Sequence, residues 1–290
     1  MSWRVVVVSN SAKLDYHMGY LTVRQETTTK IHLSEIAVLM IESTAVSMTA
    51  YLLSELIKKK IKVIFCDEKR NPASELIPYY GSHDTSVKLR KQIEWSKQIK
   101  EAVWTEIVSE KIRQQAELLK YYERPEAEML SGYIQEIQLG DVTNREGHAA
   151  KVYFNALFGM TFTRTEESSI NAALNYGYGI LLSTFNREIV ANGYITQLGL
   201  FHDNMFNPFN LASDLMEPYR PIIDARVLKM KVEKFEHDEK MQVVDVLNTE
   251  VVIGGKREYV NNAIKIYCRS IFDALNDNEL SQIKFYRNEL

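Results

Sequence analysis

Short apolar runs separated by polar turns mark the first eighty residues of the chain. The runs are rich in Val, Ile, Leu and Thr, residue types that fit the pleated surface of a sheet. The run at 35–43 has almost no polar interruption, which is typical of a strand buried on both faces. Strands are therefore predicted at 4–9, 20–25, 29–33, 35–43 and 62–67, with one helix at 48–60.

From about Asp84 onward, apolar positions recur with the spacing of amphipathic helices, and Pro and Gly-Gly pairs interrupt the pattern. A loop-rich stretch at 67–84, with a short β segment at 74–80, separates the two patterns. We therefore predict an α+β protein of two domains, a small β-rich sheet or sandwich at 1–80 and a larger all-α domain at 81–290. Helices are predicted at 86–122, 126–138, 145–158, 168–191, 210–230 and 257–275.

The composition of the chain indicates which broad class of protein it belongs to. The chain has 290 residues, of which 46% are apolar and 25% are charged, as in a folded globular protein. No apolar run is long enough to cross a membrane, and the four valines at 5–8 read as a strand core and not as a signal peptide. Cys66 and Cys268 lie in unrelated contexts, which excludes a disulfide framework or a cysteine zinc site. We therefore expect a cytoplasmic protein with no membrane contact.

The distribution of charged residues along the chain says more about possible partners than the net charge does. A formal net charge of −3 argues weakly against a general polyanion binder. Lys and Arg are bunched, however, at 58–62, 88–100 and 254–258. Each bunch taken alone is best explained as a solvated helix face or turn.

One stretch, "GLFHDNMFNPFNLASDLMEPYRPIID" at 199–224, places a histidine and two acids near apolar residues. Asp214 and Glu217 are three residues apart, so on a helix they share one face. His202 stands at the edge of a loop rich in Asn and Pro. An ordinary explanation also exists, in which Asn210 caps a helix and the acids favour its first turns.

A second stretch, "TNREGHAAKVYFNALFG" at 143–159, places Glu146 at the start of a helix whose next residues are unusually small. Small residues allow another backbone or a ligand to approach closely. The T-x-x-E spacing from Thr143 to Glu146 equally fits a capping box. Taken alone, His202 reads as a hydrogen-bonded loop or core histidine, and His148 and His237 look still more ordinary.

Glu146, His202 and Glu217 together would supply two carboxylates and one imidazole. That donor set suits a divalent cation with positions left for water and substrate. Mn²⁺ tolerates the mixed set readily, and Mg²⁺ could be held with several waters retained. Zn²⁺ is less favoured. Each motif is weak alone, and the set becomes specific only if the three residues meet in space.

Three segments in order carry a family resemblance: "NREGHAAKVYF", "INAALNYGYGILLS", and "GLFHDN" followed by "NLASDLMEPYRP". Behind a β-rich N-terminal part, this set resembles the CRISPR-associated adaptation integrases, the subunits that insert new spacers into a CRISPR array. Length, the "GGKRE" turn and the helical ending resemble the short form that accompanies the single-protein RNA-guided effector nuclease. The resemblance covers essentially the whole chain.

The resemblance implies catalytic and metal-ligating roles for Glu146, His202 and Glu217, with Mg²⁺ or Mn²⁺ as cofactor. Asp214 would support the site or bind a further ion. Many family members carry Asp where this chain has Glu217, so the extra methylene could change ligand distance or metal preference. The implied reaction is an endonuclease-like transesterification, in which the 3′-hydroxyl of a prespacer attacks the repeat DNA.

The resemblance also implies partners. It predicts a homodimer joined through the β-rich domains, with two dimers bridging a small ferredoxin-like companion subunit in a heterohexamer. Double-stranded prespacer DNA and CRISPR repeat DNA would bind across that assembly. Lys151, Lys256 and Arg257 are candidate phosphate contacts, because DNA binding needs a local basic stripe and not a basic protein.

Alternatives remain open from the residues alone. The chain could be a stand-alone metal-dependent DNA nuclease that uses water as nucleophile, or a non-catalytic DNA-binding scaffold whose acids only cap helices. His202 could be a general acid–base instead of a ligand. Arg220, three residues after Glu217, is expected to form a structural ion pair with it. Asn171 and Asn175, one turn apart, could orient the site.

Overall fold

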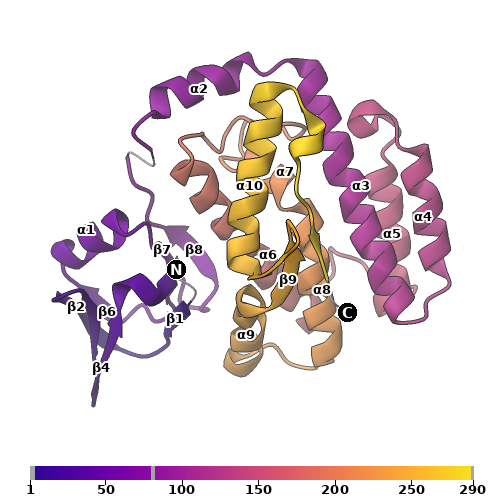
Figure 1. Ribbon diagram of the computed structural model, residues 1–290. Coiled ribbons are helices and arrows are strands. Elements are labelled where there is room, and N and C mark those ends of the chain that lie inside the picture. The colour runs from indigo at the N-terminus through magenta and orange to yellow at the C-terminus, as the bar shows by residue number, and fades with distance from the viewer. Residues whose placement is uncertain (1–3, 80–81, 289–290) are drawn as a thin grey trace.

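A computed structural model of the protein describes residues 4–79 and 82–288 and has a β-rich first part followed by a larger, largely helical part (Figure 1). This order confirms the predicted fold class. The boundary at residue 80 falls outside the described residues, so the division at 1–80 and 81–290 stays a prediction.

The N-terminal part contains two four-stranded sheets. The first has the order β1 (Arg4–Val8), β5 (Ile36–Ile41), β7 (Lys62–Cys66), β8 (Pro72–Glu75), with β8 alone antiparallel to its neighbour. The second has the order β4 (Thr28–His32), β3 (Tyr20–Arg24), β2 (Ala12–His17), β6 (Val46–Met48). Helix α1 (Ala50–Lys58) begins where the Thr49 hydroxyl accepts a hydrogen bond from Leu52 N–H.

Strand β5 belongs to the hydrophobic cores of both parts. All six of its residues are buried, as the unbroken apolar run predicts. Leu39 and Ile41 pack in the core of the sheets, whereas Val38 and Met40 pack in the core of the helices. The two parts therefore share one continuous apolar layer through this strand.

The helical part surrounds the long helix α3 (Lys97–Tyr121), which contacts α4, α5, α8 and α10, while α2 crosses from the β-rich part to its start (Figure 1). A helix of this length with many buried residues forms the centre of a bundle. The other helices are α2 (Thr85–Glu94), α4 (Glu126–Glu136), α5 (Arg145–Phe158), α6 (Ser169–Ala191), α7 (Asn210–Leu215), α8 (Arg220–Met230), α9 (His237–Val244) and α10 (Val260–Asp277).

Two of the predicted helices are broken. The pattern at 86–122 divides at Trp95, because Ser96 adopts an extended conformation and its side chain caps α3. The pattern at 210–230 divides into α7, a 3-10 turn at Glu217–Tyr219 and α8. Pro218 and Pro221 lack the N–H that a continuous helix needs, so each occurs in the first turn of a new segment.

The C-terminal part also contains a small sheet, which corrects the expectation of an all-α domain. Strand β9 (Glu250–Ile253) pairs with β10 (Lys256–Tyr259) and β11 (Tyr286–Arg287). Gly254 and Gly255 have φ values of 57° and 76°, which allows the two-residue turn between β9 and β10. Helix α10 consequently begins at Val260 and not at 257.

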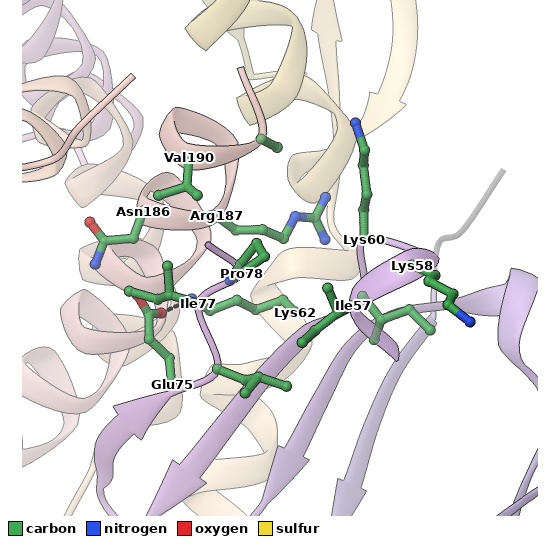
Figure 2. Close-up of a pocket in the computed structure, with 13 residues that line it drawn as sticks. Ile57, Lys58, Lys60, Lys62, Glu75, Ile77, Pro78, Asn186, Arg187 and Val190 are labelled. Atoms are coloured by element: carbon green, nitrogen blue, oxygen red, sulfur yellow. Dashed lines mark ion pairs between the residues drawn. The ribbon is translucent and has the colours of Figure 1, made fainter. Parts of the chain in front are cut away.

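Polar contacts accompany the apolar contact between the two parts. Glu42, directly after β5, is fully buried, with its Oε2 3.2 Å from Nδ1 of the partly exposed His237 of α9. Within the β-rich part, Lys62 and Glu75 form a buried ion pair, which lines a cavity of about 300 Å³ between α1, the β8 strand end and α6 (Figure 2). His237 thus contacts both parts, where its sequence context suggested an ordinary histidine.

No helix in the described parts of the chain is both long and apolar enough to cross a membrane.

Gly177 of α6 is expected to tolerate no side chain. A Cβ there would lie 2.4 Å from Ile223 Cγ2 and 3.0 Å from Val243 Cγ1, so Gly177→Ala should lower the free energy of unfolding by about 1–3 kcal/mol through overpacking. Gly179 of the same helix has no atom within 4 Å of its Cβ position, so Gly179→Ala should raise it by up to about 1 kcal/mol. Urea unfolding measures both, and equal effects would contradict this packing.

Candidate functional site

Three residues that are far apart in the sequence line one cavity of about 290 Å³ in the helical part. Glu146 lies in the first turn of α5, His202 lies in the loop between α6 and α7, and Glu217 begins the 3-10 turn between α7 and α8. The cavity is also lined by Trp104, Lys111, Gln115, Ala150, Phe154, Arg164, Tyr178, Arg220 and Asp224. The structure therefore brings the two sequence motifs together.

Glu146 is free to face the cavity because other residues cap α5. Asn144, in the left-handed region with a φ of 53°, accepts a hydrogen bond from Gly147 N–H at 3.2 Å. Asp141 accepts from the N–H groups of Arg145 and Glu146 at 2.8 and 3.0 Å. The predicted capping box from Thr143 to Glu146 is therefore wrong.

Asp214 holds both the backbone and the ring of the His202 loop. Its carboxylate is fully buried and accepts hydrogen bonds from the N–H groups of Leu200, Phe201 and His202 at 2.6, 3.1 and 3.1 Å. The carboxylate also lies 2.5 Å from His202 Nδ1. This hydrogen bond raises the pKa of His202, in opposition to burial, and leaves Nε2 as the ring nitrogen for the cavity.

The same loop requires a glycine and a buried asparagine. A Cβ on Gly199 would lie 2.3 Å from the His202 carbonyl oxygen and 2.7 Å from Asp214 Oδ2. Asn210 donates to the carbonyl oxygens of Gln197 and Asn204 at 3.0 and 3.1 Å. Asn210 is the first residue of α7 and makes no side-chain cap, so the predicted capping role is wrong.

Lys111 of α3 lies between the two glutamates. Its ammonium contacts Glu146 Oε1 and is 2.5 Å from Glu217 Oε2. Burial alone would lower the pKa of Lys111, but the charges of Glu217 and Glu146 outweigh it and raise that pKa. The two carboxylates therefore keep the buried Lys111 charged.

Glu217 has a second cationic partner. Arg220 Nε donates to Glu217 Oε1 at 2.8 Å, which confirms the expected ion pair. Burial would raise the pKa of Glu217, but Arg220 and Lys111 together hold that pKa below its usual value. Glu217 is consequently an ionised carboxylate in a nearly fully buried position.

The two carboxylates and the imidazole are ligand types that bind divalent cations, although in this structure both carboxylates contact Lys111. Both carboxylates already converge on one positive centre, and Asp214 orients the imidazole as the carboxylate partners of metal-ligating histidines do. Within 4–79 and 82–288, however, no three His, Cys, Asp or Glu side chains are arranged to hold a metal ion. A cation bound by Glu146 and Glu217 would have to replace the Lys111 ammonium.

Tyr178 and Asp224 form the inner wall of the cavity, and the fully buried Tyr153 supports Asp224 from behind that wall. Asp224 of α8 accepts hydrogen bonds from Tyr153 at 3.0 Å and Tyr178 at 2.5 Å. Burial raises the pKa of Asp224 to about 6, although both hydrogen bonds lower it. The Arg220 guanidinium lies over the Tyr178 ring at 4.5 Å from its centre, so this wall also supports the partner of Glu217.

The other residues singled out from the sequence lie elsewhere. Lys151 is exposed on α5, and Lys256 and Arg257 are exposed on β10, so none of the three lines this cavity. Their DNA contacts stay predictions. His148 is exposed on α5, as expected of an ordinary surface histidine.

Sequence reasoning missed Lys111 and Arg164. Lys111 follows Ile107 by four residues and so lies on the buried face of α3. A charged residue on a buried helix face indicates that a charged or polar partner lies opposite it. Arg164 lies in an irregular loop with no local pattern. Its partners Asn171 and Asn175 were singled out, but nothing in the sequence connects them with an arginine.

Comparisons with known proteins show the family and the fold of the chain. The sequence profile described as CRISPR associated protein Cas1 matches residues 5–245. The CRISPR-associated endonuclease Cas1 of Neisseria meningitidis serogroup C (strain 8013) is 37% identical over 232 residues, 79% of this chain and 76% of that protein. Two solved structures share the fold. A casposase bound to integration product has a TM-score of 0.78 at 16% identity, over 97% of this chain and 92% of that chain. A Cas6-RT-Cas1–Cas2 complex has a TM-score of 0.75 at 17% identity, over 99% of this chain and 36% of that chain.

Asp214→Asn is expected to lower the pKa of His202, because the substitution removes the hydrogen bond and charge that raise it. In the wild type, the contact between protonated His202 and Asp214 contributes its full stabilisation at pH values below the unfolded-state pKa of His202, about 6.5. That stabilisation is lost as the pH rises through the higher folded-state pKa of His202. The wild type should therefore exceed Asp214→Asn in free energy of unfolding by a smaller margin at pH values above the folded-state pKa of His202. NMR titration of the His202 ring measures the shift, with the exposed His148 as internal control, and an unchanged His202 pKa would contradict the assignment.

Proposed function

This chain belongs to the CRISPR-associated Cas1 family, and from that premise we propose that it joins short DNA fragments to a CRISPR array by transesterification. Relatives carry the name endonuclease, which describes phosphodiester chemistry on nucleic acid. The observation that carries the proposal is the common cavity of Glu146, His202 and Glu217, which come from three separate segments.

We assign the binding of Mg²⁺ or Mn²⁺ to Glu146, His202 and Glu217. Such an ion supplies Lewis acidity at a phosphate oxygen and offsets charge in the transition state. Asp214 would keep the His202 ring in the tautomer with Nε2 unprotonated. Arg220 would hold the Glu217 carboxylate from its other oxygen, so that one oxygen stays directed into the cavity.

The reaction exchanges one phosphodiester for another. The 3′-oxygen of the incoming fragment forms a bond to phosphorus of the repeat strand, and the bond from that phosphorus to the 3′-oxygen of the repeat breaks. The attacking hydroxyl loses its proton to solvent, and the leaving oxygen gains one. No nucleotide cofactor is needed for this balance, and the chain has no G-x-x-x-x-G-K-[ST] phosphate loop.

The proposed partners follow from the structural neighbours. One is a casposase bound to integration product, and another is a complex that contains Cas1 and Cas2. We propose a homodimer joined through the β-rich parts, with two dimers on a small ferredoxin-like companion in a heterohexamer. Prespacer DNA and repeat DNA would then reach the cavity from the surface of that assembly.

A stand-alone DNA nuclease is the second candidate, because the relatives are named endonucleases. It would use the same residues, with water in place of the 3′-hydroxyl. The product distinguishes the two functions, since integration gives a joined strand and hydrolysis gives only a free end.

Single substitutions of the three cavity residues are expected to abolish strand joining. Labelled prespacer with free 3′-hydroxyls would be incubated with a leader–repeat target, the companion subunit and Mn²⁺ or Mg²⁺. Glu146→Ala, His202→Ala and Glu217→Ala should each lower the joining rate about a hundredfold or more, because each removes a proposed ligand. DNA binding, measured by fluorescence anisotropy, should survive.

Matched controls come from the same helices or from the surface. His148→Ala on α5 and Glu128→Ala on α4 remove an exposed histidine and an exposed acid and should join at the wild-type rate. Joining by all three cavity variants at that rate would show that Glu146, His202 and Glu217 are not the catalytic residues. DNA binding without joining, by wild type and variants alike, would leave only a DNA-binding scaffold. A His202 variant that shifts the pH profile while keeping its metal requirement would assign His202 as acid–base instead of ligand.

Lys111→Met should increase the affinity of the chain for Mn²⁺, because it removes the ammonium that competes for Glu146 and Glu217. In the presence of a chelator, the free energy of unfolding of this variant should be about 3 kcal/mol lower than that of the wild type, since Glu146 and Glu217 lose their shared cationic partner. Isothermal titration and urea unfolding without DNA measure the two effects. Weaker Mn²⁺ binding by Lys111→Met would show that the lysine supports the cation and does not compete with it.

A further inference from the structure

Arg164 is the cation of the cavity whose charge has no acidic partner. The other two cations, Lys111 and Arg220, are paired with Glu146 and Glu217. Across 4–79 and 82–288, no ion pair joins Arg164 to an acid, and its side-chain hydrogen bonds go to neutral amide oxygens. A guanidinium that faces a polar cavity without a counter-charge is a binding group for an anion.

Two asparagines hold this guanidinium in one orientation. Nη1 donates to Asn171 Oδ1, and Nη2 donates to Asn175 Oδ1 at 2.6 Å. Asn171 also donates to the carbonyl oxygens of Thr163 and Glu166, each at 2.8 Å, which fixes the loop that carries Arg164. These contacts use two of the five guanidinium N–H groups, so three remain for a ligand.

Aromatic rings support the guanidinium from the cavity wall. Its central carbon lies 5.7 Å from the ring centre of Phe154 and 5.4 Å from that of Tyr178. Cation–π contacts of this kind stabilise the guanidinium and restrict the conformations of the Arg164 side chain. Pre-organisation of this kind lowers the entropy that a ligand would otherwise lose on ordering a long side chain.

The rest of the cavity lining is mostly polar. His202 and Gln115 carry hydrogen-bonding groups, and Lys111 and Arg220 carry positive charge. The cavity is therefore suited to a polar substrate that carries both negative charge and hydrogen-bonding atoms.

We propose that Arg164 binds a non-bridging oxygen of the repeat-strand phosphate at which the incoming 3′-oxygen attacks. Asn171 and Asn175 are positioning residues that act through Arg164. This inference rests on the proposed function, because it names the group within the DNA substrate that the same cavity recognises. It also explains why two asparagines one turn apart accept hydrogen bonds from the same guanidinium.

A charge-deletion cycle tests this contact. The target is a leader–repeat duplex with either a native phosphate or a neutral methylphosphonate at the insertion position, and the donor ends in a 3′-dideoxynucleotide so that no joining occurs. Wild type should bind the native target about tenfold more tightly than the methylphosphonate target, as a charge-assisted contact implies. Arg164→Gln should lose that tenfold on native DNA and lose nothing further on the methylphosphonate.

Further variants separate contact from structure. Arg164→Lys keeps the charge but loses the fork that both asparagines hold, so it should recover only part of the affinity. Asn175→Ala should weaken native binding about threefold and have no effect in an Arg164→Gln background. Arg269→Gln removes an exposed arginine of α10 and should leave the difference between the two targets intact. Arg164→Lys and Asn175→Ala also keep the test valid if Arg164→Gln fails to fold.

The outcomes distinguish this contact from the proposed function. If the losses from Arg164→Gln and from the methylphosphonate multiply, Arg164 does not touch that phosphate and the inference is overturned. If wild type never joins a native 3′-hydroxyl donor, integration is wrong, while the affinity cycle still reports whether Arg164 reads the phosphate. Circular dichroism and urea unfolding show whether Arg164→Gln is folded. If it is not, the Arg164→Lys and Asn175→Ala comparisons decide, and equal losses on both targets by those two variants overturn the inference.

Discussion

The site depends on the compensation of buried carboxylates. Glu217 and Asp214 are almost fully buried, and a charge so placed is costly unless it is paired and hydrogen-bonded. Asp214 is compensated by three backbone N–H groups and the His202 ring. Glu217 shares Lys111 with Glu146 and has Arg220 to itself. Each arrangement fixes a carboxylate where the proposed chemistry needs it.

The helix arrangement makes this compensation possible. Helix α3 carries Lys111 through the centre of the bundle, and α5 and the 3-10 turn after α7 bring their glutamates to it. The break at Pro218 places Glu217 at the start of a new segment, so its side chain reaches the lysine instead of following the face of one long helix. Packing constraints such as that on Gly177 keep α6, α8 and α9 in the positions that support the inner wall.

The β-rich part is connected to this bundle by contacts of two kinds. Strand β5 contributes side chains to both hydrophobic cores, which joins the two parts through apolar packing. Polar contacts cross the same region: Glu42 lies 3.2 Å from His237, Ser183 donates to Glu75 at 2.7 Å, and Arg187 donates to the Ala37 carbonyl oxygen at 2.9 Å. Because buried polar groups without partners are costly, these contacts favour one relative placement of the two parts over others.

The sequence by itself determined the local structure and the family. The unbroken apolar run became the doubly buried β5, the helical spacing became most of the helices, and the motifs around Glu146, His202 and Glu217 pointed to the family that the comparisons establish. Only the tertiary structure decided which residue caps α5, that new helical segments begin near Ser96 and Pro218, and that Lys111 and Arg164 line the cavity with the motif residues. The reason is physical. Periodicity reports which face of an element is buried, whereas the partner of a buried charge depends on which faces meet, and that is set by long-range packing.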